Sequence, residues 1–426
     1  MLSCITGRKN ISNSVPSSNR QDTIPYYQLE AEKDLNVLIN AIGDAKVVLL
    51  GESTHGTHEY YTWRNSITKR LILEKGFDFM AIEGDWTDAY RINEFIKERL
   101  HNSSEITEAL KLFDRWPSSM WGNYEIADLL QWINSYNQSS TTANKFGFYG
   151  LDLYSFWEWT QQEMNMPDTN LQNLIKKVRI FFAVYNNDAL KYSAALRQLK
   201  NDGSGLVNQL FNKIIKLNHG KQPSDEKEFI LYQQAWLTLN GEQFFRSRLN
   251  DRVKAINIRD EHMAGTIKRL LDFYGPDARA VVWVHNGHAG DIRYSSSGAS
   301  GYTSVGEILK RDYGRDKIFS VGFGTYEGTV MAGYTWNAPL QEQKVFPAKE
   351  GSWEYLLHKQ NNANKLILSK ELRNIPRLNK WIELRSIGAA YDGAALYNPS
   401  ILPQRFDAFL FIDSTTALRP IGIKRN

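Results

Sequence analysis

The stretch KVVLLGESTHGTHEYYTWRNSITKRLILEKGFDFMAIEG, residues 46–84, decides the fold. Its opening run, KVVLLGE (46–52), is short, apolar and β-rich, which predicts a buried strand. A helix is predicted from about His58 to Lys75, ending at Gly76, because glycine is favoured just past a helix C-terminus. FDFMAIEG (77–84) predicts a second strand. A strand, a helix and a strand in succession form a βαβ unit, which implies parallel pairing and an α/β fold.

The rest of the chain extends this unit with further strands and one long helical part. Strands are predicted at KFGFYGLD (145–152), ARAVVWVHNGH (278–288), KIFSVGFGT (317–325) and FDAFLFID (406–413). Between about residues 154 and 275, apolar residues recur at helical spacing with almost no strand pattern. The predicted fold is therefore an α/β core with a mostly parallel sheet, flanking helices and a large helical insertion.

We divide the chain accordingly into four parts. Residues 1–24 are rich in Ser and Asn and predict a disordered tail. The two parts of the α/β core are residues 25–153 and 276–426, and the helical insertion is residues 154–275. Two local predictions accompany this division, a helix over Tyr26–Ala41 and a flexible loop at SSSGASG (295–301).

Composition argues against several classes of protein. Lys and Arg exceed Asp and Glu by only 51 − 47 = 4, and they are spread along the chain, whereas a nucleic-acid-binding face needs clustered basic residues. The chain has a single cysteine, Cys4, and no apolar run near the ~20 residues of a membrane helix. The N-terminus also lacks the apolar core of about 7–15 residues that a signal peptide needs. We therefore expect a cytoplasmic protein with no nucleic-acid or membrane partner.

Residues that carry chemistry follow the carboxyl ends of four predicted strands. The four strands end at Glu52, Glu83, Asp152 and His285. His55 lies just beyond the first, Asp85 follows the second, and His288 and Asp291 lie close behind the fourth. In an open parallel sheet, ligands bind at that edge because loops and helix N-termini converge there. We therefore predict an active-site cleft at the carboxyl ends of the strands. Burial of Glu83 is expected to raise the pKa of its carboxyl toward the range that acid–base catalysis uses.

Most of these residues also have a structural interpretation. Glu52 suits the start of the following helix, where backbone N–H groups stabilise an acid. His58 suits an exposed first helical turn, and Arg64 suits either a surface charge or an anchor for a carboxylate or oxyanion. Asp152 is equally suited to orienting its neighbours and to binding directly. His55 lies on a strand-to-helix turn with little core to fill, which favours a functional role.

Zinc is the metal that the residue types allow. Glu52, His55, His58 and His285 carry N and O donors of the kind that zinc binds. Their spacing is not the helical H-E-x-x-H of zinc proteases, so zinc stays the alternative and we expect no metal or other cofactor. The sequence has no P-loop, no G-x-G-x-x-G after the first strand and no G-x-S-x-G nucleophile elbow. The catalytic chemistry that remains is attack by a water molecule that a histidine between carboxylates activates.

Seven motifs follow one another along nearly the whole predicted fold, from about residue 45 to 420. They are LLGESTHGTHEYYTWRNSITKRLILEKGFDFMAIEGDW, RWPSSMWGNYEIADLLQWINSYN, FGFYGLDLYS, NIRDEHMA, VWVHNGHAGD, VGFGTYEGTV and FDAFLFIDSTTALRP. In this order they resemble the erythromycin esterase family, and above all its erythromycin-esterase-like or succinoglycan-biosynthesis-like branch. The resemblance implies a hydrolase that opens the lactone ring of macrolide antibiotics, using a histidine-activated water beside two glutamates. It also implies a deep cleft between an α/β core and a large helical part.

The family's site residues carry over onto this chain motif by motif. The active-site positions are then Glu52, His55, Arg64, Glu83, His285 and His288, with Arg259 as a further cleft residue. The resemblance makes His55 the general base and makes Glu83 the group that orients it or the water. It makes Arg64 and the two later histidines the groups that polarise the ester carbonyl or hold the developing oxyanion.

Two other hypotheses keep the same site. In the first, the protein is an esterase or acyl-tailoring enzyme that acts on acylated sugars or secondary metabolites and is inactive on macrolides. Trp121 suits stacking on a sugar face or packing in the core, and with Arg259 and Asp152 it is a substrate-binding candidate. In the second, the protein binds an apolar ligand without converting it, although so many polar residues at one edge argue against that. In either enzyme the partner is a small-molecule ester or lactone.

Overall fold

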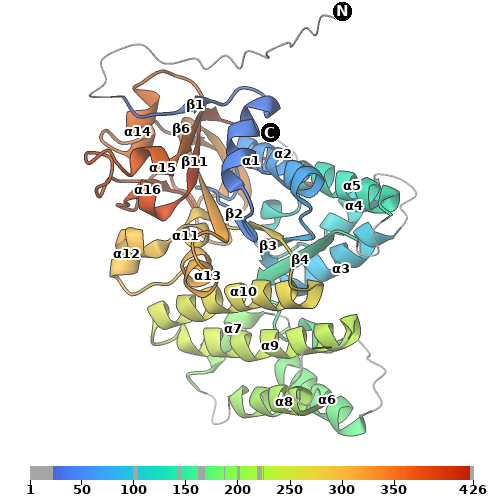
Figure 1. Cartoon of the computed structure of the whole chain (residues 1–426). Helices are drawn as coiled ribbons and strands as arrows, with labels where there is room; N and C mark the ends of the chain where they lie inside the picture. The colour runs from blue at the N-terminus through green and yellow to red at the C-terminus, as the bar shows by residue number, and fades with distance from the viewer. Residues whose placement is uncertain are drawn as a thin grey trace, which may run out of the picture.

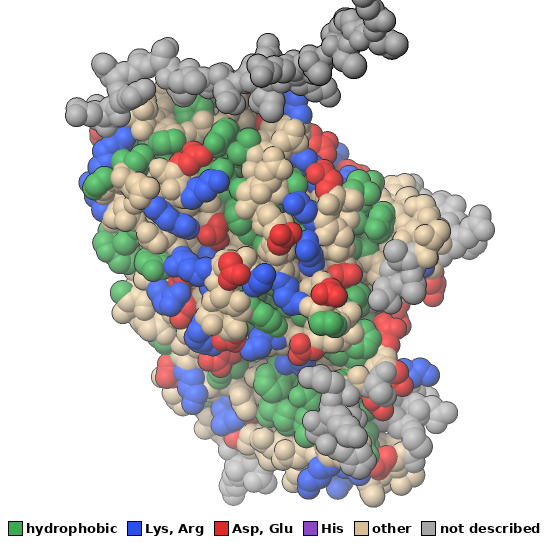
Figure 2. Space-filling view, in the orientation of Figure 1, with side chains coloured by type: hydrophobic (Ala, Val, Ile, Leu, Met, Phe, Trp, Pro, Cys, Tyr) green, Lys and Arg blue, Asp and Glu red, His purple; other side chains and the backbone are tan. Residues whose placement is uncertain are grey.

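The computed structural model describes residues 23–98, 104–141, 145–161, 168–186, 188–198, 202–217, 223 and 225–422. Figure 1 shows a sheet flanked by helices, with a stack of long helices below it. The predicted tail, residues 1–24, lies outside the described residues except for Thr23 and Ile24. On the face drawn in Figure 2, basic and acidic side chains are interspersed. None of the helices in the described part of the chain combines the length and the apolarity of a membrane span.

The core is a nine-stranded sheet in the order β1-β8-β11-β6-β2-β5-β3-β4, with β7 paired to β6 outside that order. Its strands are β1 (Tyr27–Gln28), β2 (Val47–Leu50), β3 (Phe79–Asp85), β4 (Gly147–Asp152), β5 (Ala280–Trp283), β6 (Ile318–Gly333), β7 (Leu340–Val345), β8 (Lys365–Leu368) and β11 (Ala408–Thr415). Every pair from β11 to β4 is parallel, whereas the pairs that involve β1, β7 or β8 are antiparallel. Two further short strands, β9 (Arg385–Ser386) and β10 (Leu396–Tyr397), pair with each other. The predicted α/β fold with a mostly parallel sheet is confirmed.

The β2–α2–β3 unit forms with bounds close to the predicted ones. Helix α2 spans His58–Lys75 and ends at Gly76, whose left-handed conformation (φ 65°) lets its N–H donate to the carbonyl of Leu71. Strands β2 and β3 run parallel as predicted, but they are not neighbours, because β5 pairs with both of them. All of β5 is buried, and a strand that is apolar on both faces suits the centre of a parallel sheet.

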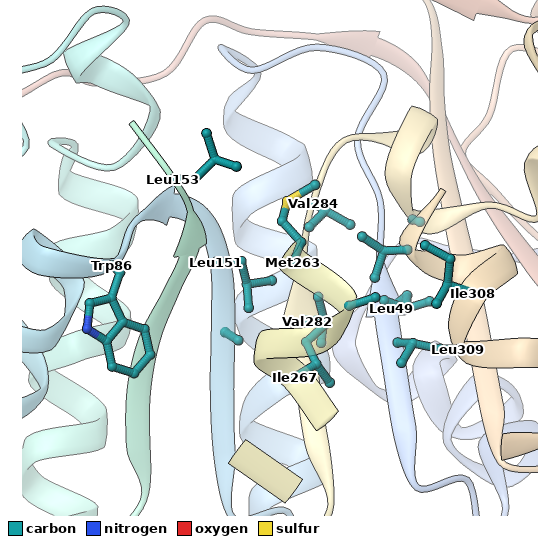
Figure 3. Close-up of a cluster of buried hydrophobic side chains, with 14 of the residues drawn as sticks. Leu49, Trp86, Leu151, Leu153, Met263, Ile267, Val282, Val284, Ile308 and Leu309 are labelled. Carbon is teal, nitrogen blue, oxygen red and sulfur yellow. The ribbon is translucent and has the colours of Figure 1, made fainter. Parts of the chain in front are cut away.

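Both faces of the sheet are buried, because successive side chains along a strand point to opposite faces. Leu49 and Val282 face a core that includes Met263 and Ile267 of α10 (Arg252–Tyr274) and Ile308 of α13 (Val305–Tyr313), as Figure 3 shows. The residues that alternate with them on β2 and β5 face a second core, which α2 and α5 (Tyr124–Ser139) cover. Helix α10 therefore packs directly on one face of the sheet.

The described residues between β4 and β5 contain helices and no strand. The helices in this part are the 3-10 helix η3 (Glu158–Gln161), then α6 (Thr169–Ala183), α7 (Ala189–Ala195), α8 (Ser204–Leu217), α9 (Glu226–Ser247) and α10. In Figure 1, α10 lies next to the sheet, α9 lies beside α10, and α6 and α8 lie farthest away. Apolar side chains of these helices and of the sheet form one continuous core. The division of the chain into four parts stays a prediction.

The remaining helices are short connections and caps around the sheet. They are η1 (Glu32–Leu35), α1 (Asn36–Ile42), α3 (Trp86–Lys97), α4 (Ser104–Leu110), η2 (Ser118–Met120), α11 (Asn286–Ala289), η4 (Ile292–Tyr294), α12 (Ser296–Ala299), α14 (Trp353–His358), α15 (Ser369–Leu372) and α16 (Leu402–Arg405). Two local predictions need correction. The predicted helix over Tyr26–Ala41 is confirmed from Glu32 onward, where η1 and α1 follow one another, but its start is strand β1, because residues 27 and 28 pair with β8 at the sheet edge. The predicted loop at 295–301 contains α12, which the Ser295 hydroxyl caps by accepting the N–H of Gly298.

Gly56 is the glycine whose replacement we expect to disturb the turn after β2 most. Its carbonyl accepts the N–H groups of Met331 and Leu418, and a Cβ added to it would overlap the backbone of Met331. Overpacking of this kind destabilises a protein, so Gly56→Ala should lower the free energy of unfolding by about 1–3 kcal/mol in urea titrations. Gly205→Ala is the control, because no atom lies within 4 Å of the added Cβ and alanine is favoured in the helix. Equal effects of the two changes would contradict this prediction.

Candidate active site

The carboxyl ends of β2, β5, β3 and β4 meet at one edge of the sheet, because these strands are parallel neighbours. The side chains that meet there are Glu52, Glu83, Asp152 and His285, joined by His55, His288 and Arg259. All of these residues are site candidates from the sequence. The strand order brings them together, since ligand-binding groups of a parallel sheet collect at this edge.

His55 lies on the turn between β2 and α2, with one ring nitrogen held and the other available. Its Nδ1 donates to Oε1 of Glu52 at 2.8 Å, because a carboxylate only accepts. No described residue forms a hydrogen bond with Nε2, and the side chain is 15% exposed. The lone pair on Nε2 is therefore free to take a proton, which is the state that a general base needs.

Arg64 is fully buried behind this pair. Its Nη2 donates to Oε2 of Glu52 at 2.5 Å, and both side chains have an exposed fraction of 0%. The guanidinium carbon lies 4.3 Å from the ring centre of Tyr61 and 4.4 Å from that of Trp283. The surface-charge interpretation of Arg64 is wrong, because its helix face packs on the sheet. A carbonyl-polarising role does not fit either, since the group that Arg64 reaches is Glu52 and not an open site.

Glu83, at the end of β3, is held by a cation and by the backbone of another strand end. Its Oε1 accepts from Nη2 of Arg259 at 2.8 Å and its Oε2 accepts from the backbone N–H of His285 at 2.7 Å. Arg259 also donates to both oxygens of Asp152, at 2.9 and 2.5 Å. Burial would raise the pKa of Glu83, but His288 and Arg259 outweigh it and lower that pKa well below its usual value. The predicted upward shift is therefore wrong, and Glu83 is a carboxylate.

His285 faces His55 across the site, with ring centres 5.1 Å apart. Burial and the neighbouring His55 lower the pKa of His285 to about 3, so the ring is neutral. Its Nδ1 accepts the backbone N–H of Gly287 at 3.1 Å. The single ring hydrogen of His285 must then reside on Nε2, which makes that nitrogen a donor.

His288 is held on both sides of its ring. Its Nδ1 donates to Oδ1 of Asp260 at 2.7 Å, and its Nε2 lies 3.4 Å from Oε1 of Glu83 and 3.1 Å from Nη1 of Arg259. Asp260 is a site residue that reasoning from the sequence missed. The signal was present, because Asp260 directly follows Arg259 in the motif NIRDEHMA.

The zinc alternative needs four donors around one point, and the structure separates them. The side chain of His58 contacts Glu125 instead, and Nδ1 of His58 lies 2.6 Å from Oε1 of Glu125. Glu52 already holds Arg64 and His55. Among the described residues, no group of three or more His, Cys, Asp and Glu side chains is placed to hold a metal ion. The donors that the sequence offers therefore do not fit a zinc site.

A family model described as Erythromycin esterase matches residues 72–415. The chain belongs to the erythromycin esterase family. It is 23% identical over 415 residues to an Escherichia coli protein named erythromycin esterase type II, covering 90% of this chain and 93% of that one. Membership of the erythromycin esterase family supports an esterase-type hydrolase at the level of the family.

Solved structures show that this erythromycin esterase family member shares its fold with proteins of different names. One is a Bacillus cereus protein, with a TM-score of 0.72 and 18% identity over 93% of this chain and 96% of the other. A second is a succinoglycan biosynthesis protein, with a TM-score of 0.68 and 20% identity over 92% and 95% of the two chains. A third is a mutant of the erythromycin esterase EreC in its open conformation, with a TM-score of 0.65 and 17% identity over 92% and 97%.

Trp121 does not line the site of this erythromycin esterase family member. The side chain is 4% exposed, its indole N–H donates to the carbonyl of Glu83 at 2.9 Å, and its ring packs near Tyr61. A Cβ added to Gly84 would overlap the indole, so the absence of a side chain there makes room for Trp121. The core interpretation is the one that the structure supports, and the substrate-stacking role of Trp121 is wrong.

A cavity of about 460 Å³ lies along the first turns of α10, close in sequence to Arg259 and Asp260. It is lined by Asp251, Val253, Lys254, Asn257, Ile258 and Glu261, and by none of the site side chains. The deep cleft that the family resemblance implies for erythromycin esterases stays a prediction for this chain.

Proposed function

We propose that the protein hydrolyses a carboxylic ester or lactone, and that its substrate is a 14-membered macrolide such as erythromycin. The observation that carries the chemistry is the pair of Glu52 and His55. Because Nδ1 of His55 donates to Glu52, the neutral ring has its lone pair on Nε2, and no described residue occupies that atom. A histidine held in this tautomer by a carboxylate is a general base for water.

The proposed reaction begins when Nε2 of His55 takes a proton from water as the water oxygen attacks the ester carbonyl carbon. The carbonyl oxygen gains the negative charge, and we assign its stabilisation to the cationic end of the site, where the guanidinium of Arg259 lies beside His288. When the tetrahedral intermediate collapses, the bond from carbon to the alkoxide oxygen breaks. His55 returns its proton to that alkoxide. Ester and water thus give one acid and one alcohol, and a lactone gains one water.

The other site residues position these groups. Arg64 holds the second oxygen of Glu52, so the carboxylate keeps its orientation toward His55. Glu83 fixes the backbone of His285 and the guanidinium of Arg259. A site assembled by such support holds the reacting groups within the narrow range of geometry that catalysis needs.

Two observations support the macrolide as substrate over an acylated sugar. The family model and the Escherichia coli relative, both of which are described as erythromycin esterases, match most of the chain. If erythromycin is the substrate, hydrolysis of its ring would inactivate the antibiotic.

The test is mass spectrometry of erythromycin incubated with the purified protein, with and without EDTA. We expect a product heavier by one water, formed at the same rate in both conditions. The matched pair of variants is His55→Asn and His358→Asn, because His358 forms a similar pair with Asp413 at 2.8 Å outside the site. Product should be lost in the first variant and retained in the second. An unchanged mass would reject the macrolide, and turnover of acetylated sugars would then support the other substrate. Loss of product with EDTA would contradict the metal-free reaction.

A further inference from the structure

Two tryptophans from distant parts of the chain lie in contact beside the site. Trp116 is the first tryptophan of the motif RWPSSMWGNYEIADLLQWINSYN, and Trp336 lies in the connection between β6 and β7. Their ring centres are 4.6 Å apart, and the ring planes are inclined by 57°. Trp121 of the same motif is buried, whereas Trp116 is partly exposed and Trp336 has an exposed fraction of 59%. We call Trp116 and Trp336 the aromatic pair.

Strand β6 brings the aromatic pair to the edge of the sheet at which the site lies. Only the first part of β6 pairs with β2, and the rest of the strand extends past the carboxyl end of β2. There the N–H of Met331 donates to the carbonyl of Gly56, the residue after His55. Gly333 lies two residues, or roughly 7 Å, farther along the strand. A Cβ added to Gly333 would lie 3.0 Å from the ring of Trp116, so the aromatic pair neighbours the turn that carries His55.

A second contact joins the aromatic pair to the end of β3. Arg115 directly precedes Trp116, and its Nε donates to Oδ2 of Asp85 at 2.6 Å. Asp85 is the last residue of β3 and follows Glu83 by two positions. The aromatic pair is therefore attached both to the turn that follows β2 and to the end of β3, and these are the two segments that supply His55 and Glu83.

The loop that presents Trp336 is fixed in place. The indole N–H of Trp116 donates to the carbonyl of Ala338, in the same loop, at 2.9 Å. The backbone of Gly333, where the loop begins, forms two further hydrogen bonds, at 3.1 and 2.8 Å, with residues 389 and 391. A side chain on a loop that is already ordered loses little freedom when a ligand binds, which favours affinity.

The exposed surface of this loop suits a sugar ring. One face of a sugar ring consists of C–H groups that pack on an indole, and its hydroxyl groups form hydrogen bonds. Trp336 is flanked by Thr335 and Asn337, which are exposed, and Tyr334 is 57% exposed. These neighbours carry hydroxyl and amide groups, and the loop 334–339 has no charged residue. A purely apolar ligand would not use the hydroxyl and amide groups, and a charged ligand would find no opposite charge in the loop.

We infer that the aromatic pair is a subsite for a sugar ring of the substrate, and that Trp336 is its specificity-determining residue. The inference rests on the proposed function and extends it, because it places a sugar of the macrolide on Trp336 while the lactone lies beside His55. Erythromycin carries sugars on its lactone ring, and its aglycone does not. An acylated sugar offers the same ring chemistry, so the experiment includes both sources of a sugar.

The test is calorimetric titration of the full chain carrying His55→Asn, in which we expect hydrolysis to be lost. The ligands are erythromycin, its aglycone and an acetylated glucoside. Erythromycin should bind more tightly than the aglycone. Adding Trp336→Ala should weaken the binding of erythromycin about 10-fold, as expected for an aromatic residue on which binding energy is concentrated. The same change should remove the preference for erythromycin over the aglycone, whereas Trp336→Phe keeps an aromatic face and should retain most of that preference.

The matched control is Trp381→Ala. Trp381 is similarly exposed, at 50%, but lies between α15 and β9, so this change should leave the affinity for erythromycin and for the aglycone as it was. A urea titration of Trp336→Ala reports on the fold, and an exposed side chain predicts little change in stability. An equal loss of affinity for erythromycin and its aglycone in Trp336→Ala would overturn the inference, because Trp336 would then not contact the sugar. An unchanged preference would overturn it as well.

The same change separates this inference from the proposed function. In the otherwise wild-type protein, Trp336→Ala should raise KM for erythromycin about 10-fold with a much smaller effect on kcat, because it removes binding that does not change in the transition state. Product formed with no dependence on Trp336 would overturn the subsite and leave the hydrolysis standing. Sugar-dependent binding without product would support the subsite and reject the hydrolysis. Dependence on Trp336 with the acetylated glucoside alone would support the subsite and reject the macrolide, and binding of none of the ligands would overturn both.

Discussion

We expect the His55→Ala variant to hydrolyse erythromycin about 10²–10⁴-fold more slowly than the wild type, because it removes the general base. The loss should appear in kcat, since Nε2 of His55 is assigned to the proton transfer. The variant should also keep its fold, because the side chain is partly exposed and makes a single hydrogen bond, to Glu52. Glu52 remains paired with Arg64, so no buried charge is left uncompensated. Initial rates of product formation and a urea titration measure the two effects.

The control for this prediction is His358→Ala, which removes a histidine from a similar carboxylate pair. It should retain wild-type kcat. Turnover of His55→Ala at the wild-type rate would remove His55 from the mechanism. A large loss of stability in the same variant would instead show that His55 has a structural role, which a single hydrogen bond of a partly exposed side chain does not predict.

The second large effect is on stability. Arg64→Met should lower the free energy of unfolding by about 3–5 kcal/mol, because it leaves the carboxylate of Glu52 buried without a cation. Both side chains are fully buried, and the guanidinium also packs between Tyr61 and Trp283. The double variant Arg64→Met with Glu52→Gln should recover part of the loss, since it removes the uncompensated charge. Urea unfolding of the wild type, the two single variants and the double variant measures this cycle.

Arg70→Met is the matched control on the same helix. Arg70 pairs with Glu74, whose side chain is 43% exposed, and exposed pairs contribute about 0–1 kcal/mol. The two variants therefore make the same change of residue type in α2 in two different environments. Equal losses of stability would contradict the claim that burial of the pair of Glu52 and Arg64 makes it important.

Hydrophobic patterning was sufficient to predict the architecture. The strands β2, β4 and β5 and the helix α2 fall within the predicted runs, and β3 extends one residue beyond its run. The strands were predictable because a strand buried on both faces has a continuous apolar sequence. Parallel strands present their carboxyl ends at one edge of the sheet. This rule predicted that four residues far apart in the chain lie close together, namely Glu52, Glu83, Asp152 and His285. The order of the strands in the sheet could not be predicted in this way, because the spacing of apolar residues does not indicate that β5 lies between β2 and β3.

The sequence by itself determined the fold class, the edge of the sheet at which the site lies and the residue types that meet there. Only the tertiary structure decided how deeply these residues are buried, which groups they contact and which charge they carry. It buries Arg64 against Glu52, places Trp121 in the core, lowers the pKa of Glu83 against the expectation from burial, and brings Asp260 to His288. The physical reason is that strand patterning is a local property of the chain. The charge of a buried group depends instead on which oppositely charged groups the rest of the fold brings within about 4 Å.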